Sequence, residues 1–250
     1  IIVFILSITC DLSFPFGAIS IDICPPITAS KSGNLSLGNH TTEFEKMMTD
    51  LTGGKYAVSV SSGGSALELT LRSLHLNGRE VIVPTDTFVA TANAVILAGG
   101  VPVFADIEKD TLCLDPEDLL SRVSSKTAGV IYVHMFGLIP KSFIKVREFC
   151  KNHDLFLIED AAHAHGSKIG EEVAGNLADA GCFSFYATKI LTSGEGGVVT
   201  TNNATLSNSI RSLRNHGRKQ DSNLYDKVSN NYRMPEISCL VALHQLKILG

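Results

Sequence analysis

One lysine of the chain, Lys189, lies in a sequence context that is unusual for a charged side chain. It follows an apolar, aromatic run that begins at Cys182, and it precedes a glycine cluster that ends at Gly197. Burying an ammonium group costs several kcal/mol unless its charge is matched or removed. In a desolvated pocket, or as an imine with an aldehyde, a lysine becomes the covalent catalyst of Schiff-base chemistry. Lys189 is therefore a candidate for that chemistry.

A serine- and glycine-rich segment, Ser61-Ser-Gly-Gly-Ser65, joins a predicted strand to a predicted helix. Its glycines permit close approach to the backbone, and the first N–H groups of a helix bind an anion well, most naturally a phosphate. The segment matches neither the dinucleotide-binding motif nor the P-loop motif. A plain tight turn therefore stands beside a phosphate cradle as an interpretation.

An acidic segment, Glu159-Asp160-Ala-Ala-His163, directly follows an apolar run. A carboxylate at the end of a buried strand is costly unless it meets a cation. The functional interpretation is a carboxylate that keeps a ring nitrogen protonated. The alternatives are Asp160 as the N-cap of a helix and His163 as a core histidine. A phosphate cradle, an acidic partner for a ring nitrogen and an imine-forming lysine together describe a site for pyridoxal 5'-phosphate (PLP).

The elements that must position these residues alternate between strand and helix patterns from about residue 56. Predicted strands cover residues 56–60, 80–84, 101–104, 130–133 and 155–158. Two predicted helices cover residues 65–74 and 90–98, a third begins at Asp115, and a fourth includes residues 146–150. Apolar strands with helical crossovers predict a three-layer α/β/α fold with a buried, mostly parallel central sheet.

Residues 182–186 and 198–201 predict two more strands, which are joined by the Lys189 loop and are too close together for a helical crossover. In an open α/β sheet, ligands bind outside the carboxyl ends of the strands. We therefore expect the serine- and glycine-rich segment, the acidic segment and the lysine loop to converge on one site.

The composition fits one globular domain. Of 250 residues, 44% are hydrophobic and 18% are charged, and the net charge of −4 gives no footprint for nucleic acid. The six cysteines lack metal-ligand spacing, which favours reduced thiols in a cytoplasmic protein and no metal site. The apolar run at residues 1–8 is too short to span a bilayer. We assign residues 1–29 to an N-terminal segment of uncertain role.

The motifs in this order resemble the DegT/StrS-type sugar aminotransferases, a branch of the PLP-dependent enzymes with the aspartate-aminotransferase fold (fold type I). The resemblance runs from about residue 30 to the last residue. It is carried by residues 35–38 (LSLG), 43–45 (EFE), 60–67 (VSSGGSAL), 83–93 (VPTDTFVATAN), 101–106 (VPVFAD), 158–166 (IEDAAHAHG), the lysine segment, 211–217 (RSLRNHG) and 231–236 (NYRMPE).

The resemblance implies a role for each matching position. Lys189 is similar to the lysine that forms the Schiff base with the cofactor and later moves the proton. Asp160 is similar to the partner of the pyridine nitrogen, and His163 stands near the ring hydroxyl. Phe88 matches the aromatic residue that stacks on the ring, with a core phenylalanine as the alternative. Ser184 matches a serine that binds the phosphate.

Other positions concern the phosphate and the second subunit. Gly63, Gly64 and Ser65 match the phosphate-binding turn, but Gly64 and Ser65 stand where the family usually has Thr and Ala, so a threonine hydroxyl is lost. Asn231 matches an asparagine that reaches the phosphate of the neighbouring subunit's cofactor, which implies a homodimer. A polar turn is the alternative there. Weaker candidates for lining residues are His134, Tyr186, Glu195 and Arg233.

The resemblance implies that residues 30–250 form the PLP-binding large domain, that the small C-terminal domain is absent, and that the chain is C-terminally truncated. The expected activity is transfer of an amino group from an amino acid, with glutamate as the expected donor, to a keto sugar. That sugar is typically nucleotide-linked, in amino-sugar and polysaccharide biosynthesis. Lys189 argues against the sugar dehydratases of this family, in which that position resembles a histidine. The alternatives are a non-catalytic regulatory or partner protein and a cyclitol- or aminobenzoate-forming relative.

Overall fold

The computed structural model describes residues 33–219 and 222–249. The predicted N-terminal segment, with Cys10 and Cys24, lies outside the described residues. The other four cysteines are buried free thiols, at positions 113, 150, 182 and 239.

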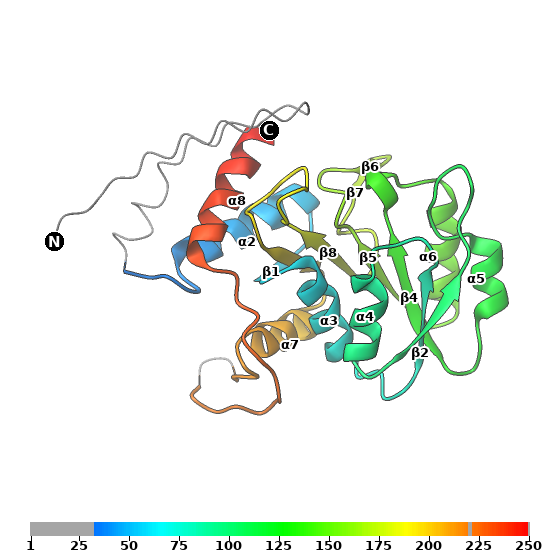
Figure 1. Cartoon of the computed structure of the whole chain (residues 1–250), viewed down its shortest axis with the longest axis horizontal. Coiled ribbons are helices and arrows are strands. Elements are labelled where there is room, and N and C mark those ends of the chain that lie inside the picture. The colour runs from blue at the N-terminus through cyan, green and yellow to red at the C-terminus, as the bar shows by residue number, and fades with distance from the viewer. Residues whose placement is uncertain (1–32, 220–221, 250) are drawn as a thin grey trace.

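A seven-stranded sheet forms the centre of the molecule (Figure 1). Its strand order is β1 (Tyr56–Val60), β9 (Gly197–Thr201), β8 (Ala180–Ser184), β5 (Phe156–Asp160), β4 (Thr127–Val133), β2 (Glu80–Pro84) and β3 (Val101–Ala105). Only β9 runs antiparallel to its neighbours β1 and β8. The predicted mostly parallel α/β sheet is therefore confirmed. A small hairpin, β6 (Lys168–Ile169) and β7 (Glu172–Val173), stands apart from this sheet.

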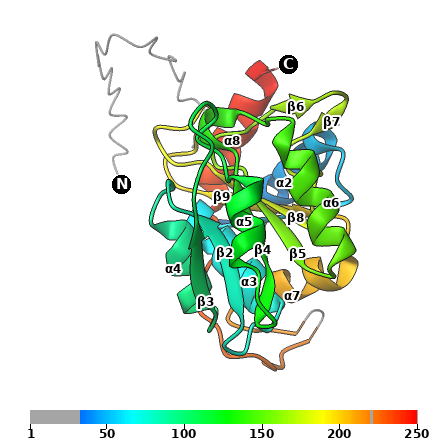
Figure 2. The same ribbon diagram turned by 90° about the vertical axis from the view of Figure 1, so that its right-hand side faces the viewer.

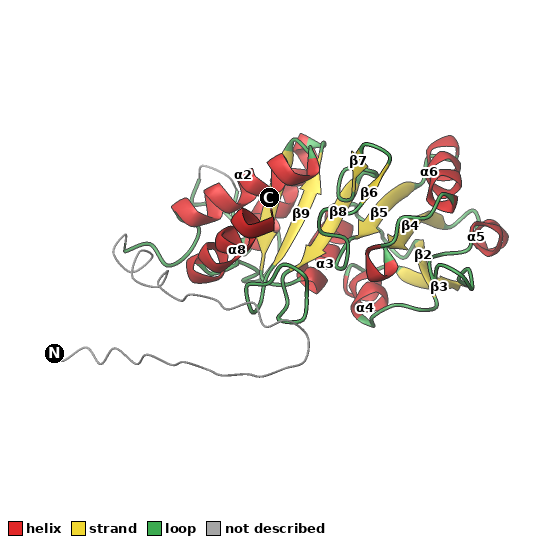
Figure 3. Ribbon diagram, turned by 90° about the horizontal axis from the view of Figure 1, so that it is seen from above, coloured by secondary structure: helices red, strands yellow, loops and turns green. Residues whose placement is uncertain are grey.

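Helices cover both faces of the sheet. They are α2 (Asn39–Thr52), α3 (Gly63–Ser73), α4 (Ala90–Leu97), α5 (Pro116–Arg122), α6 (Ser142–Asn152), α7 (Ala204–Arg214) and α8 (Glu236–Leu249), with a short 3-10 turn, η1 (Met135–Gly137). Figure 3 shows α3 and α4 on one side of the sheet and α2 and α6 on the other. The strand β3 forms one edge (Figure 2).

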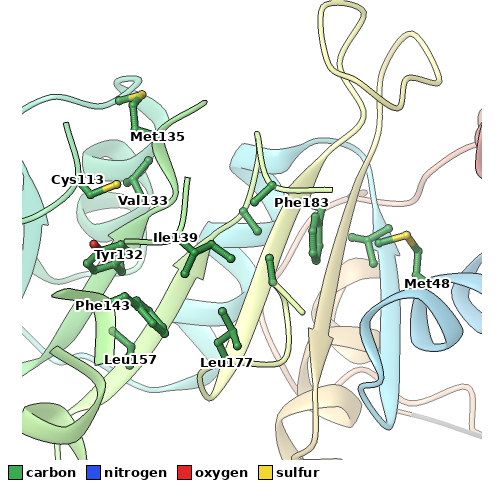
Figure 4. Close-up of a cluster of buried hydrophobic side chains, with 14 of the residues drawn as sticks. Met48, Cys113, Tyr132, Val133, Met135, Ile139, Phe143, Leu157, Leu177 and Phe183 are labelled. Atoms are coloured by element: carbon green, nitrogen blue, oxygen red, sulfur yellow. The ribbon is translucent and has the colours of Figure 1, made fainter. Parts of the chain in front are cut away.

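Each face has its own apolar core. The larger cluster includes Met48 of α2, Phe143 of α6 and Phe183 of β8 (Figure 4). The other cluster packs α3, α4 and α7 against the opposite face, with Leu67 and Ile210 among its buried members. Because both faces are covered, the strands are apolar almost throughout, which is the pattern that predicted them.

The free edge of β1 is capped by charged side chains. Arg211 donates to the carbonyl of Ala57, and Arg214 donates to that of Ser59. The carboxylate of Glu45 accepts from the backbone N–H of Ser59 and pairs with both arginines. An edge strand exposes unpaired backbone groups that invite another chain to pair with it. These three side chains satisfy the carbonyls of Ala57 and Ser59 and the N–H of Ser59 from within the chain.

The helix that begins at Pro116 has the predicted start. Asp115 is its N-cap and accepts from the backbone N–H of Glu117, and Pro116 occupies the first turn. The alternative of a helix N-cap at Asp160 is wrong, because β5 ends there and turns follow it. Within the part of the chain that the structure describes, no helix combines the length and the apolar character that crossing a bilayer requires.

Candidate active site at the carboxyl ends of the strands

A cavity of about 640 Å³ lies at the carboxyl ends of the strands. The predicted residues that line it are Gly63, Gly64, Phe88, Asp160, His163, Ser184 and Lys189, together with the weaker candidates His134, Tyr186 and Glu195. The expected convergence of the three segments is thus observed. Ser65, Asn231 and Arg233 are not among the lining residues.

Those three residues have other contacts. The Ser65 hydroxyl lies 3.0 Å from that of Ser61 and 2.9 Å from that of Ser62. Asn231 is exposed and forms an isolated bridge with Asn215. The guanidinium of Arg233 donates to the Asn215 side chain. Ser65 therefore braces the turn before α3, and Asn231 lies outside the cavity of its own chain.

The two neighbouring carboxylates of β5 lie in different environments. Glu159 is fully buried, and it accepts from His134 Nε2 at 2.9 Å and from the backbone N–H groups of Gly175 and Leu177, both at 2.8 Å. Asp160 instead lines the cavity. Since side chains alternate between the faces of a strand, only Asp160 is available to a ligand.

Asp160 is a buried carboxyl group whose ionised form a cation would stabilise. Thr91 Oγ1 donates to its Oδ2 at 2.8 Å, and the backbone N–H of Ala162 donates to its Oδ1 at 3.3 Å. Burial raises the pKa of Asp160, against the opposing effects of these hydrogen bonds and of the nearby His163 and Lys189. No ion pair within the described residues involves Asp160. A protonated ring nitrogen would supply the missing positive charge.

Lys189 and His163 are both half-buried on the cavity wall. Burial lowers the pKa of Lys189, while the charge of Asp160 opposes that shift. A lower pKa increases the fraction of neutral amine, which is the nucleophilic form. Burial and the charge of Lys189 lower the pKa of His163. The Phe136 ring lies parallel to the His163 ring, with 6.1 Å between centroids.

The first turn of α3 lies on the cavity wall, where its backbone N–H groups could hold an anion. A Cβ added at Gly63 would lie 2.8 Å from Ser184 Cβ, so the glycine lets the turn approach the serine closely. The first N–H groups of a helix have no acceptor within the helix. At Gly64 an added Cβ would make only ordinary contact, 3.6 Å from Ala90 Cβ. A Cβ is therefore tolerated at Gly64, and no close approach requires the glycine there.

Phe88 is 77% exposed and lines the cavity, so the core-phenylalanine alternative is wrong. Sequence reasoning missed Thr87 and Thr91, which also line the cavity. Both belong to the segment 83–93 that carries part of the family resemblance, and this was the available signal.

The sequence model of the DegT/DnrJ/EryC1/StrS aminotransferase family matches residues 27–250. The chain belongs to this family. Members of the DegT/DnrJ/EryC1/StrS family are PLP-dependent, and a similar solved structure, that of NtdA from Bacillus subtilis, contains bound PMP (28% identity, TM-score 0.83, 89% of this chain and 51% of that chain). The cradle, the half-buried amine, the buried carboxylate and the exposed aromatic ring of this chain fit PLP.

Relatives within the DegT/DnrJ/EryC1/StrS family have named functions. The spore coat polysaccharide biosynthesis protein SpsC of Bacillus subtilis is 40% identical over 231 residues, which are 88% of this chain and 59% of that protein. GDP-perosamine synthase of Caulobacter vibrioides is 37% identical over 214 residues, 85% of this chain and 57% of that protein. The structure of DesI with its TDP-sugar product has 36% identity and a TM-score of 0.82, and covers 89% of this chain and 56% of that one. The chain thus spans less than two thirds of the length of these relatives.

Metal-ligating side chains form no cluster among the described residues. No group of three or more His, Cys, Asp or Glu side chains in residues 33–219 and 222–249 could hold a metal ion. The four thiols seen in the structure are also unreactive, because burial raises the pKa of each one, for example that of Cys150 to about 12.

Proposed function

We propose that this chain is the PLP-binding part of a sugar aminotransferase. It would serve the transfer of an amino group from an amino acid, with glutamate as the expected donor, to a keto sugar linked to a nucleotide. The observation that carries the proposal is that Lys189 and Asp160 line one cavity together with the anion cradle at Gly63. The named relatives support a nucleotide-linked sugar, and SpsC supports a pathway of polysaccharide biosynthesis.

Each side chain would act at a stated atom. When bound, PLP supplies an electron sink for the bonds of the substrate amine. The neutral amine of Lys189 would hold the cofactor covalently and would move the proton of the substrate amine. The Asp160 carboxylate would keep a ring nitrogen protonated. His163 would donate or accept a hydrogen bond beside the ring, and Phe88 would pack against it.

The phosphate would be held at the amino end of α3. The N–H groups of Gly63 and Gly64 and the hydroxyl of Ser184 converge there, and none of the three is a cation. Binding would rest on backbone dipoles and hydrogen bonds, which a helix N-terminus supplies. Gly63, Gly64 and Ser184 would thus hold the phosphate, and Asp160 would hold the ring nitrogen.

A homodimer is part of the proposal. Asn231 lies outside the cavity of its own chain, where the family resemblance would have it reach a second subunit's phosphate. The helix α4 also leaves Ile96 and Leu97 57% and 65% exposed, next to the 58% exposed Val89. Exposed apolar groups of this kind favour an interface with another chain. A cytoplasmic location remains a prediction.

Amino transfer by the whole protein tests the function. The protein loaded with PLP is mixed with glutamate, and the release of 2-oxoglutarate is measured before and after addition of keto-sugar nucleotides carrying GDP, UDP or TDP. We expect one turnover without the sugar and continuous turnover with its preferred sugar. Bound PLP without release of the corresponding 2-oxo acid, from glutamate or from any other amino acid tested as donor, would instead support the non-catalytic alternative.

A further inference from the structure

Three hydrogen-bonded side chains, those of Thr87, Thr91 and Asp160, link the start of α4 to the end of β5. The hydroxyl oxygens of Thr87 and Thr91 lie 2.8 Å apart, and Thr91 Oγ1 donates to Asp160 Oδ2, also at 2.8 Å. Thr91 is fully buried, Thr87 is half-buried, and all three residues line the cavity. The hydrogen bond between Thr91 and Asp160 joins residues that are 69 positions apart in the sequence.

The direction of these hydrogen bonds depends on the charge of the carboxyl group. An ionised carboxylate only accepts, and a threonine hydroxyl has a single proton. When Asp160 is ionised, the Thr91 hydroxyl must donate its hydrogen bond to Asp160 and accept a hydrogen bond from the Thr87 hydroxyl. The backbone N–H of Ala162 holds the other carboxylate oxygen at 3.3 Å. Both oxygens then accept a hydrogen bond, and these two bonds favour the ionised form against the opposing effect of burial.

The same turn also carries Phe88. The backbone N–H of Thr91 donates to the carbonyl of Phe88 at 3.0 Å, so the two residues belong to one hydrogen-bonded turn. A flat heterocycle in the cavity would meet the Phe88 ring with its face and the Asp160 carboxylate with its nitrogen edge. The turn that contains Phe88 and Thr91 would therefore set the position of the Phe88 ring relative to the Asp160 carboxylate.

We propose that Thr91, supported by Thr87, is a positioning residue that holds the Asp160 carboxylate ionised and aimed at the ring nitrogen of the cofactor. This inference rests on the proposed function, since it assumes PLP in the cavity. Thr91 itself makes no contact with reacting atoms. Its effect should therefore appear only with a ligand that has a ring nitrogen.

The test compares PLP with its 1-deaza analogue, in which a C–H group replaces the ring nitrogen. The affinities of both ligands are measured by absorbance titration of wild type, Thr91→Val and Thr91→Ser. Because a hydrogen bond to a charged group is lost, Thr91→Val should weaken PLP binding roughly tenfold and change binding of the analogue by less than about twofold. Thr91→Ser keeps the hydroxyl and should keep the preference for PLP.

A matched control is Thr70→Val. Thr70 is equally buried, on α3, and its hydroxyl donates to the Ala66 carbonyl away from the cavity. We expect this variant to bind both ligands as the wild type does. If Thr91→Val does not fold, Thr91→Ala replaces it with the same expected loss of preference.

The outcomes separate the two proposals. If Thr91→Val loses the same affinity for PLP and for the analogue, or keeps the wild-type preference for PLP, the positioning role is overturned, but the PLP site is not. If the wild type binds neither ligand, the proposed function fails and this inference fails with it.

Discussion

The side chains of Glu159 and Asp160 lie on opposite faces of the sheet, although the two residues are adjacent on β5. Glu159 is enclosed by His134 and two backbone N–H groups, whereas Asp160 lines the cavity beside Thr91. One carboxylate thus stabilises the fold, and the other is left for a ligand. The two can be tested separately.

Asp160→Asn removes the negative charge but preserves the shape of the side chain. We expect PLP affinity to fall by roughly one to two orders of magnitude, because a hydrogen bond to a charged group is lost. The free energy of unfolding without cofactor should stay the same or increase, since burial raises the pKa of Asp160 and so disfavours its ionised form. Absorbance titration and urea unfolding measure the two quantities. A variant that binds PLP as tightly as wild type would contradict the role of Asp160.

Glu159→Gln should give the converse result. A neutral amide cannot accept from all three donors that surround Glu159, so one buried partner is left unsatisfied. We expect the free energy of unfolding to fall by about 1–3 kcal/mol, with PLP affinity nearly unchanged. Urea unfolding and the same titration measure both. Loss of PLP affinity without loss of stability would show that Glu159 serves the ligand.

Gly63→Ala and Gly64→Ala form a matched pair in the anion cradle. The added methyl group at Gly63 would lie 2.8 Å from Ser184 Cβ, whereas at Gly64 its closest contact is 3.6 Å, to Ala90 Cβ. We therefore expect Gly63→Ala to separate the turn from Ser184 and weaken PLP binding, and Gly64→Ala to bind PLP as wild type does. Equal affinities for the two variants would mean that the cradle does not hold the phosphate.

His165 predicts a pH dependence of stability. It is buried between the rings of Phe183 and Phe185, and burial, together with the charges of Lys189 and His163, lowers its pKa to about 4. Between its ordinary pKa and about 4, the unfolded chain binds the proton more tightly than the folded chain. The folded state should therefore lose up to a few kcal/mol as the pH falls through this window.

His165→Gln should lose less stability over the same pH range, because it has no group to protonate there. Unfolding in urea at pH 7 and at pH values down to about 4.5 measures the difference between the two proteins. Parallel pH curves for wild type and variant would contradict a buried neutral histidine at this position.

The sheet was predictable because its signals are local. Apolar runs such as residues 56–60 and 80–84 are the observed strands β1 and β2. Parallel strands place their carboxyl ends at one edge, so the convergence of Asp160 and Lys189 followed from the order of the elements. The predicted strand at 182–186 begins and ends two residues too late, because aromatic residues continue beyond the last pair of β8.

Other features depend on contacts between distant segments. The helices α2 and α7 were not predicted, although each has buried apolar residues at helical spacing, such as Leu206 and Ile210 of α7. Their packing partners, α8 for α2 and α3 for α7, lie far away in the sequence. The bond from Thr91 to Asp160 joins two elements that the sequence alone does not place together. The expected role of Asn231 needs a second chain, so a single chain neither supports nor opposes it.

The central claim is that Lys189 binds PLP covalently in the cavity that also holds Asp160. The most direct measurement is to incubate the protein with PLP, reduce it with borohydride, and locate the modified residue by mass spectrometry of its peptides. Lys189→Ala and the exposed-lysine variant Lys109→Ala are treated in parallel. The account predicts one stable adduct on Lys189, lost in Lys189→Ala and kept in Lys109→Ala. Adducts scattered over surface lysines, or none at Lys189, would contradict it.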